Sequence, residues 1–403
     1  MGNCCVSQTP HSYWSRSNDS NGIQKTSSCW RVKKCTKLVQ FEDQAICKEK
    51  WMNWSDNKYS YFSNFDDSRK FICSIGQKVK IWTTSELDSE IEIEHPDKVH
   101  QWWSFYEDQR VISCCHDKLV RLYDLQDTST PLSTFKGHCA GVISGCTSLD
   151  NYMLATGGKD SKTILWDINT TKITSSLKQP GHYTTDMKWM SNNNYLFIQT
   201  AYDWTLKLYD TRDMNQTKDT CKIGQTIPRT SDIDDSGNYV ITGHSEGENA
   251  QGDLNLWDLR KMSDDTFQPI FSVSEQGRVI SARFYYKPKI TGSFKSKRKT
   301  SKDNEVSRSS IDTASNYIDY GSKFVLAAYN SKIMKLYDEN GHEVSEYSTD
   351  KQITAMCPLR TKDNSGRLGI NTDSLIVAGL EDENISLYDV DYMSHQIHII
   401  YIV

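Results

Sequence analysis

The stretch NYMLATGGKDSKTILWDIN, residues 151–169, predicts two short β-strands joined by a tight turn. Residues 153–156 form the first strand, and residues 163–167, which end in Leu-Trp-Asp, form the second. The Gly-Gly-Lys-Asp between them is typical of a turn, because glycine accepts backbone angles that other residues avoid. A Gly-His pair lies upstream, and 28 residues separate His138 from Trp166.

The aromatic residue of the second strand recurs at regular intervals along the chain. Blocks such as VRLYD, LNLWD and ISLYD place it at Trp82, Tyr123, Trp166, Tyr209, Trp257, Tyr337 and Tyr388. An apolar residue directly precedes it in every block, as in a half-buried strand. The intervals are 41, 43, 43, 48, 80 and 51 residues. The interval of 80 holds a polar insertion rather than a hidden repeat, because only one strand-like run, residues 279–286, precedes it. We count seven repeats.

These blocks resemble WD repeats, in which Gly-His and Trp-Asp mark one four-stranded blade in about 40–45 residues. The resemblance implies an all-β fold, a seven-bladed WD40 β-propeller over residues 38–403. We expect residues 1–37 to be a disordered basic leader and residues 287–321 a disordered basic insertion in blade 6. Residues 397–403 are expected to supply the last strand, in preference to residues 38–41, because they follow Tyr388 directly.

The resemblance also implies a hydrogen-bonded chain inside each blade, made of a His, a Ser or Thr, an Asp in the turn and the aromatic residue. Blade 3 matches in full with His138, Thr156, Asp160 and Trp166. The partial matches are His182, Asp203 and Tyr209 in blade 4, with Gln199 in the hydroxyl position; Ser113, Asp117 and Tyr123 in blade 2, where His100 lacks its preceding glycine; and Asp382 and Tyr388 in blade 7. Gly76, Gln251 and Ser331 replace the turn Asp in blades 1, 5 and 6. We interpret all of these residues as structural.

The net charge of −5 hides a strong partition. Residues 1–37 carry +5 and residues 287–310 carry +6, which leaves −16 for the rest of the chain. An acidic ring is a poor surface for nucleic acid, which needs a basic stripe. The two basic segments are therefore the expected attachment points for anionic partners such as membrane lipids.

Other classes of protein lack their sequence signals here. The twelve cysteines show no paired metal spacing, and the chain has neither a secretory leader nor an apolar run near the roughly 20 residues of a spanning helix. Motifs of serine hydrolases, zinc proteases and phosphate-binding loops are absent. We expect a cytoplasmic protein with reduced thiols that is not an enzyme and has no metal, cofactor or small-molecule substrate.

The N-terminus, Met-Gly-Asn-Cys-Cys-Val-Ser, resembles a dual-acylation signal. Myristate would join Gly2 and palmitate would join Cys4 or Cys5, and two chains anchor a protein far more firmly than one. Val6 departs from the pattern, which has Ser or Thr at that position. The alternatives are a peripheral membrane tether and an ordinary leader.

Members of the family usually bind partner peptides on the face formed by the turns between the second and third strands. The residues expected on this face are Trp103, His116, Lys159, Tyr202, Trp204, Glu246, Glu248, Asn330 and Glu381. The resemblance thus implies a non-catalytic scaffold that binds other proteins or peptides.

Two alternative functions rest on other segments. Blade 4 ends in Asp210-Thr-Arg212, and blade 5 ends in Trp257, Asp258 and Arg260, which resembles WD proteins that dock on the adaptor of cullin-4 ubiquitin ligases. The chain would then be a substrate receptor, although such arginines also pair with nearby carboxylates. The polybasic run 295–302 favours instead a propeller that binds phosphoinositides at a membrane surface.

Overall fold

The computed structural model describes residues 59–64, 70–83, 89–105, 109–245, 251–263, 267–288, 320–358, 375–380, 385–390 and 397–402. The chain divides into two units, Met1–Lys34 and Cys35–Val403, and every described residue belongs to the second. The predicted leader, the acylation candidates Gly2, Cys4 and Cys5, residues 289–319 of the insertion, and Glu246, Glu248, Glu381 and Asp382 lie outside the described residues.

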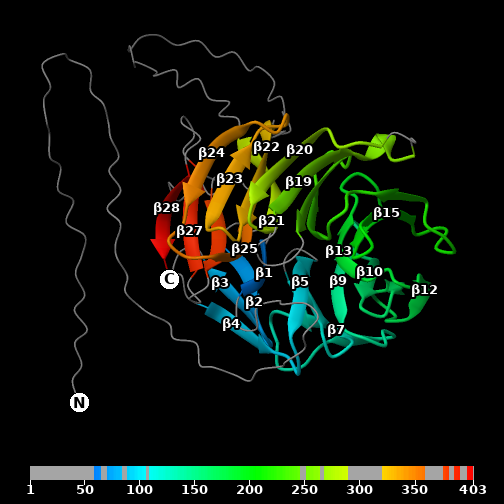
Figure 1. The fold of residues 1–403 in the computed structure, drawn as a ribbon. Helices are drawn as coiled ribbons and strands as arrows, with labels where there is room; N and C mark the ends of the chain where they lie inside the picture. Colours follow the sequence, from blue (N-terminus) through cyan, green and yellow to red (C-terminus); the bar gives the residue numbers. More distant parts are fainter. Residues whose placement is uncertain are drawn as a thin grey trace, which may run out of the picture. The chain divides into compact units, whose positions relative to one another are not determined.

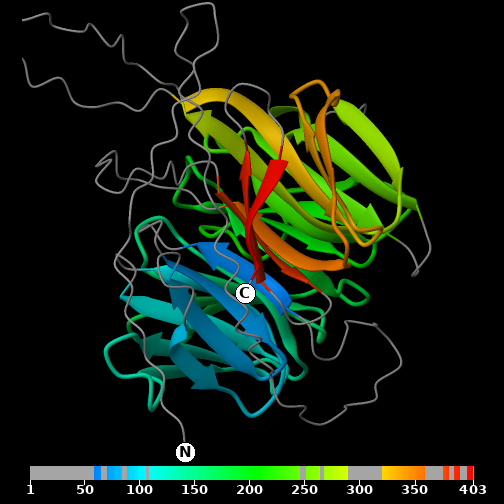
Figure 2. The same cartoon turned by 90° about the vertical axis from the view of Figure 1, so that its left-hand side faces the viewer.

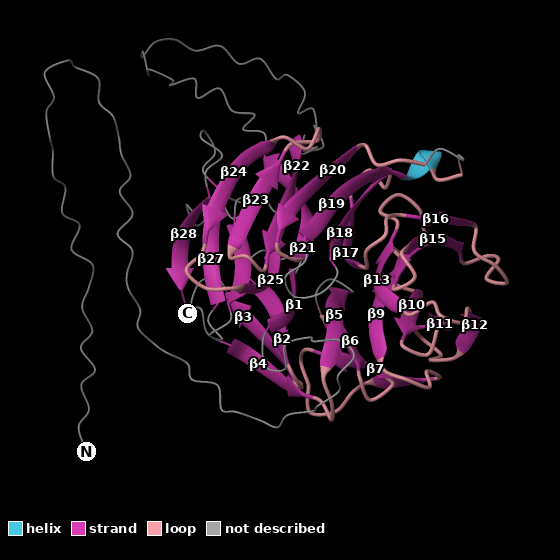
Figure 3. Ribbon diagram, viewed as in Figure 1, coloured by secondary structure: helices cyan, strands magenta, loops and turns pink. Residues whose placement is uncertain are grey.

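The described residues form seven antiparallel sheets, each built from four consecutive strands (Figures 1 and 3). Blades 1 to 4 consist of β1 (Tyr59–Asn64), β2 (Lys70–Ile75), β3 (Lys78–Thr83), β4 (Ser89–Glu94); β5 (Val99–Phe105), β6 (Arg110–Cys115), β7 (Leu119–Asp124), β8 (Ser133–Lys136); β9 (Val142–Thr147), β10 (Met153–Gly158), β11 (Lys162–Asp167), β12 (Ile173–Lys178); and β13 (Thr184–Trp189), β14 (Leu196–Ala201), β15 (Thr205–Asp210), β16 (Asp219–Lys222). Blades 5 to 7 consist of β17 (Pro228–Ile233), β18 (Tyr239–Ser245), β19 (Gln251–Asp258), β20 (Phe271–Gln276); β21 (Val279–Pro288), β22 (Tyr320–Tyr329), β23 (Ile333–Tyr337), β24 (Glu343–Ser348); and β25 (Ile353–Pro358), β26 (Leu375–Leu380), β27 (Ile385–Val390), β28 (Ile397–Ile402). One 3₁₀ turn, Leu259–Lys261, follows β19.

The first strands of successive blades contact one another and close a ring, since β25 also contacts β1. Figure 2 shows the last blade, in red, between the blue strands of blade 1 and the orange strands of blade 6. The C-terminal run is β28, which pairs with β27 inside blade 7 and confirms its predicted place. The insertion in blade 6 separates β21 from β22, and these strands extend further into the segment 287–321 than expected, to Pro288 and from Tyr320.

The apolar core lies between neighbouring blades. All seven repeated aromatic side chains are buried, and each is at most 4% exposed. Trp166 of blade 3, for example, packs in one cluster with Ile112 and Phe135 of blade 2. Because each blade buries its face against the next, closing the ring stabilises every blade. The seven-bladed all-β fold predicted from the repeat is confirmed.

A β-bulge recurs at the same point in every blade. The pairing of the first strand with the second omits the second residue of the first strand. A bulge redirects the side chain of its extra residue. The omitted residues, here called the bulge ring, are Ser60, His100, Ile143, Thr185, Arg229, Ile280 and Thr354. All of them except Ser60, whose side chain is not described, line a central cavity.

Candidate partner-binding face

Hydrogen bonds tie two kinds of loop together at one end of the blades. The turn between the second and third strands bonds to the link that enters the same blade, as in Tyr202 N–H to Tyr183 O (2.8 Å) and Asn330 N–H to Arg278 O (3.0 Å). The same turns bond to the link that leaves the blade, as in Ile223 N–H to Trp204 O (2.9 Å). These turns and links together are called the top face, and the loops at the other strand ends form the bottom face.

The structure places five of the predicted face residues in top-face turns. They are His116, Lys159, Tyr202, Trp204 and Asn330. The prediction for Trp103 is wrong. This side chain lies within β5, where its Nε1–H donates to Thr147 Oγ1 (3.3 Å) and its ring packs against the core shared by blades 2 and 3. The sequence did not show that β5 directs the Trp103 side chain into the core between blades 2 and 3.

Three large aromatic side chains are exposed on the top face of blade 4. Tyr183 is 43% exposed, Tyr202 40% and Trp204 39%. Trp204 also has a φ of +66°, the left-handed conformation that Lys118, Ser161 and Lys332 adopt at the matching turn position of blades 2, 3 and 6. Tyr183 was missed by the sequence analysis, although it directly follows the Gly181-His182 pair that marks the blade.

The hydrogen-bonded chain predicted for blade 3 is complete. His138 Nδ1 lies 3.0 Å from Asp160 Oδ1, His138 Nε2 lies 2.9 Å from Thr156 Oγ1, and Trp166 Nε1–H donates to the same hydroxyl (2.8 Å). Burial raises the pKa of Asp160, but hydrogen bonds from His138 and the Cys139 N–H outweigh it and leave the pKa below its usual value. The chain ties the link, the turn and both middle strands of the blade together.

Blade 2 uses a different histidine from the one expected. His95 Nε2 lies 2.8 Å from Ser113 Oγ and its ring packs edge-on against Tyr123. His100 instead belongs to the bulge ring, with its Nε2 3.1 Å from Nδ1 of His116. The predicted Asp117 forms an ion pair with Arg121. The WD-repeat spacing indicated His100. The histidine that bonds to Ser113 is His95, five residues earlier in the chain.

Blades 4 and 5 also depart from the family pattern. In blade 4 His182 bonds to Asp203 (3.1 Å), while Gln199 links to Thr163 of blade 3 instead of completing the chain. In blade 5 the chain runs from Trp257 Nε1–H to Thr242 Oγ1 (2.8 Å) and on to His244 Nε2 (2.7 Å). His244 comes from the second strand itself, so the sequence pattern could not reveal it.

The two Asp-x-Arg boxes lie on the bottom face, where each arginine binds its own carboxylate. Arg212 donates to both oxygens of Asp210 and covers the Tyr195 ring at 5.0 Å. Arg260 does the same with Asp258 and also donates to the Tyr239 hydroxyl (2.9 Å). This pairing is the expected alternative to adaptor docking.

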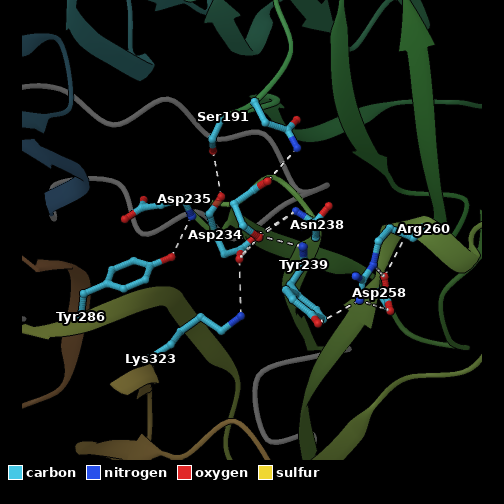
Figure 4. Close-up of polar contacts among 11 residues, drawn as sticks. Ser191, Asp234, Asp235, Asn238, Tyr239, Asp258, Arg260, Tyr286 and Lys323 are labelled. Atoms are coloured by element: carbon cyan, nitrogen blue, oxygen red, sulfur yellow. Dashed lines mark hydrogen bonds and ion pairs between the residues drawn. The ribbon is translucent and has the colours of Figure 1, made fainter. Parts of the chain in front are cut away.

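Figure 4 shows that Arg260 belongs to a larger polar network on the bottom face. Buried Asp234 accepts from the Tyr239 N–H (2.8 Å) and pairs with Lys323 of blade 6 (3.4 Å). Ser191 of blade 4 donates to the Asp234 carbonyl (2.8 Å). The turn between β17 and β18 of blade 5 is thus fastened to both neighbouring blades, a role that no sequence motif indicates.

No group of three or more His, Cys, Asp or Glu side chains among the described residues could hold a metal ion. Within the same ranges no helix is long and apolar enough to cross a membrane. The described cysteines are free, and burial raises the pKa of Cys73 and Cys115 to about 12, which keeps these thiols protonated and unreactive.

Comparison with known proteins agrees with this geometry. The model of the family "WD domain, G-beta repeat" matches residues 129–167, which span β8 to β11. Protein transport protein Sec31A of Danio rerio is 23% identical over 140 residues, 33% of this chain and 11% of the relative. Autophagy-related protein 16 of Arabidopsis thaliana is 26% identical over 164 residues, 39% of this chain and 30% of the relative. The U3 small nucleolar RNA-associated protein 15 homolog of Xenopus laevis is 33% identical over 98 residues, 24% of this chain and 19% of the relative.

The chain carries a repeat that matches the WD family model, and its described residues fold as a seven-bladed β-propeller. Its matches cover less than a third of the length of each of these relatives. WD propellers are generally non-catalytic and bind other proteins.

Proposed function

We propose that the chain is a non-catalytic scaffold in the cytoplasm whose top face binds partner proteins or peptides. The observation that carries this proposal is the cluster of Tyr183, Tyr202 and Trp204 on blade 4. Water-exposed aromatic side chains that gather in one place mark interaction sites, and Tyr and Trp dominate binding hot spots. The fold alone would not justify the assignment, because propellers host many functions.

The test is affinity purification with mass spectrometry of wild type and the variant Tyr183→Ala/Tyr202→Ala/Trp204→Asn. Asparagine suits the left-handed position of Trp204. We expect partner recovery to fall at least tenfold. Two hot-spot residues contribute about 2 kcal/mol each to the binding free energy, and a loss of about 1.4 kcal/mol lowers the affinity tenfold. Unchanged recovery of every partner would contradict the proposal.

The matched control for this experiment changes the opposite face. The variant Arg212→Ala/Arg260→Ala removes two side chains that are 63% and 57% exposed. It should keep the top-face partners. If a cullin adaptor co-purifies with wild type and is lost only in this control, the ubiquitin-ligase alternative replaces the scaffold proposal. The engagement of both arginines with their own carboxylates favours the scaffold.

We further propose that the N-terminus tethers the scaffold to a membrane, on the Gly2, Cys4 and Cys5 pattern alone. Gly2→Ala removes the acceptor for myristate and should move the protein from the membrane to the soluble fraction in cell fractionation, because one remaining lipid signal binds only marginally. An unchanged distribution would reject the tether. A variant with the lysines of residues 295–302 replaced distinguishes the lipid tether from the phosphoinositide alternative in the same assay. If phosphoinositide binding holds the protein at the membrane, only this variant should move to the soluble fraction.

A further inference from the structure

The bulge-ring side chains that line the central cavity differ in polarity and charge. Among the described members of the bulge ring, isoleucine and threonine side chains occupy the positions of blades 3, 4, 6 and 7. His100 of blade 2 has a pKa well below its usual value, because it is buried and lies near Lys98 and other cations, so it stays neutral. Arg229 of blade 5 is therefore the one permanently charged side chain of the described ring.

A second arginine directly precedes β21 of the neighbouring blade, which contacts the strand β17 that carries Arg229. Arg278 belongs to the top-face link between β20 and β21, and Asn330 Oδ1 fixes that link by accepting from the Arg278 N–H (2.7 Å). Burial first, and then the positive charge of Arg278, lower the pKa of Arg229. The two like charges thus belong to neighbouring strand ends, an arrangement that is unfavourable without a counter-charge.

Neither guanidinium has such a counter-charge in the described part of the chain. The Nε atoms of Arg229 and Arg278 are buried and have no hydrogen-bond partner. Other partly buried cations are neutralised, as Arg121 is by Asp117 and Lys335 by Glu275. Both arginines are half-buried, and a buried N–H group that is left without a partner is costly.

The carboxylate in the lining of the cavity is already committed. Asp186 accepts from the Ser231 N–H (2.9 Å) and Ser231 Oγ (3.1 Å), and it also lies 3.5 Å from Lys188 Nζ. It therefore ties strands β13 and β17 together and does not pair with Arg229. The two arginines remain available to a ligand.

We propose that Arg229 and Arg278 form an oxyanion site that takes a carboxylate or phosphate group of a partner peptide bound on the top face. The inference rests on the proposed function and names the chemistry of its partner. Guanidinium groups bind planar carboxylates and phosphates through paired, charge-assisted hydrogen bonds. Recognition of acidic motifs by clustered arginines is a common way of binding peptides.

A peptide is favoured over a free ion because the aromatic cluster adjoins the site. The first strand of blade 4, β13, contacts the strand β17 that carries Arg229, and Tyr183, Tyr202 and Trp204 all belong to blade 4. An extended segment would place an apolar or aromatic residue on blade 4 and an acidic residue at blades 5 and 6. Tyr, Trp and Arg together are the residue types enriched at the centres of binding surfaces.

The test uses an array of randomised peptides, each synthesised in three matched forms with glutamate, phosphoserine or glutamine at one position. Purified full-length protein should bind the glutamate or phosphoserine form at least tenfold more tightly than the glutamine form. Arg229→Gln/Arg278→Gln should abolish that preference while the thermal midpoint stays equal or rises, because two repelling charges are removed. The acidic form that binds more tightly, glutamate or phosphoserine, shows whether the site takes a carboxylate or a phosphate group.

The control Lys136→Gln/Lys222→Gln removes the same net charge from two exposed side chains and should keep the preference. If peptides bind with no preference for an acidic form, or the arginine variant keeps the preference, the oxyanion site is wrong while the scaffold stands. If no peptide binds in any form, the scaffold proposal itself fails. Binding of phosphoinositide vesicles that requires both arginines, without peptide binding, would assign the site to lipid and overturn the inference. Should the double variant unfold, Arg278→Gln in the link carries the same test alone.

Discussion

Replacing Trp166 with alanine should lower the free energy of unfolding by about 3–5 kcal/mol. The side chain is 1% exposed, packs edge-on against Phe135 at 5.6 Å and donates its Nε1–H to Thr156. Alanine leaves a cavity between blades 2 and 3 and removes one link of the hydrogen-bonded chain. Denaturant unfolding measures the change in the free energy of unfolding. It is followed by backbone circular dichroism, which does not depend on tryptophan.

Two further variants make this prediction specific. Trp166→Phe keeps most of the apolar volume and should cost only about 1–2 kcal/mol, the effect of losing the bond to Thr156 and changing the packing. Trp204→Asn alters a tryptophan of the exposed top face and should change stability by less than about 1 kcal/mol. Similar losses at positions 166 and 204 would refute the structural role assigned to the blade 3 chain.

Acidification from pH 6.5 toward pH 4 should destabilise the propeller. Burial lowers the pKa of both His95 and His244 to about 4. In this window the unfolded chain takes up protons that the folded chain does not, so stability is fully present above pH 6.5 and is lost as the pH falls. Each histidine should contribute on the order of 1 kcal/mol per pH unit.

Burial keeps His244 neutral, and the hydrogen bonds around it fit the neutral ring. Its Nδ1 lies 3.2 Å from the Thr226 carbonyl, so the ring proton belongs there, and Nε2 accepts from the Thr242 hydroxyl, which in turn accepts from Trp257. A proton on Nε2 would break this sequence of donors and acceptors.

The carboxylate of Asp203 loses its effect at a lower pH than these histidines. Burial raises the pKa of Asp203, but hydrogen bonds from His182 and Thr205 outweigh burial and lower the pKa to about 2. The contribution of Asp203 to the free energy of unfolding is therefore lost only between about pH 4 and pH 2.

Denaturant unfolding at several pH values between 7 and 4.5 measures this dependence. His244→Gln should reduce the slope of stability against pH by about one proton. A wild-type stability that is flat across this range would contradict the burial of neutral histidines in blades 2 and 5.

The fold was readable from the sequence because its strongest signal is a buried position that repeats. Each blade needs a large aromatic residue at the same place, and Trp or Tyr stands there in all seven. The His, Thr and Asp around it are less constrained, because packing between blades supplies most of the stability. This freedom explains how blade 5 could take its histidine from the second strand, His244, where no family spacing points.

The candidate site was readable only in part. Turn positions could be counted from the repeat, so Tyr202 and Trp204 were placed correctly on the top face. Trp103 was not, because the sequence does not show which way a residue in mid-strand points. Arg229 and Arg278 gave no signal, since their placement depends on a β-bulge and on the packing of blade 5 against blade 6.

The most direct test of the scaffold account is photo-cross-linking in cells from two tyrosine positions. A photoreactive phenylalanine analogue at position 202 probes the top face, and the same residue at position 195, where the tyrosine is 47% exposed on the bottom face, is the control. We expect a defined cross-linked partner from position 202 that position 195 does not capture. Capture of the same partner from position 195 alone would place the binding surface on the wrong face and contradict the account.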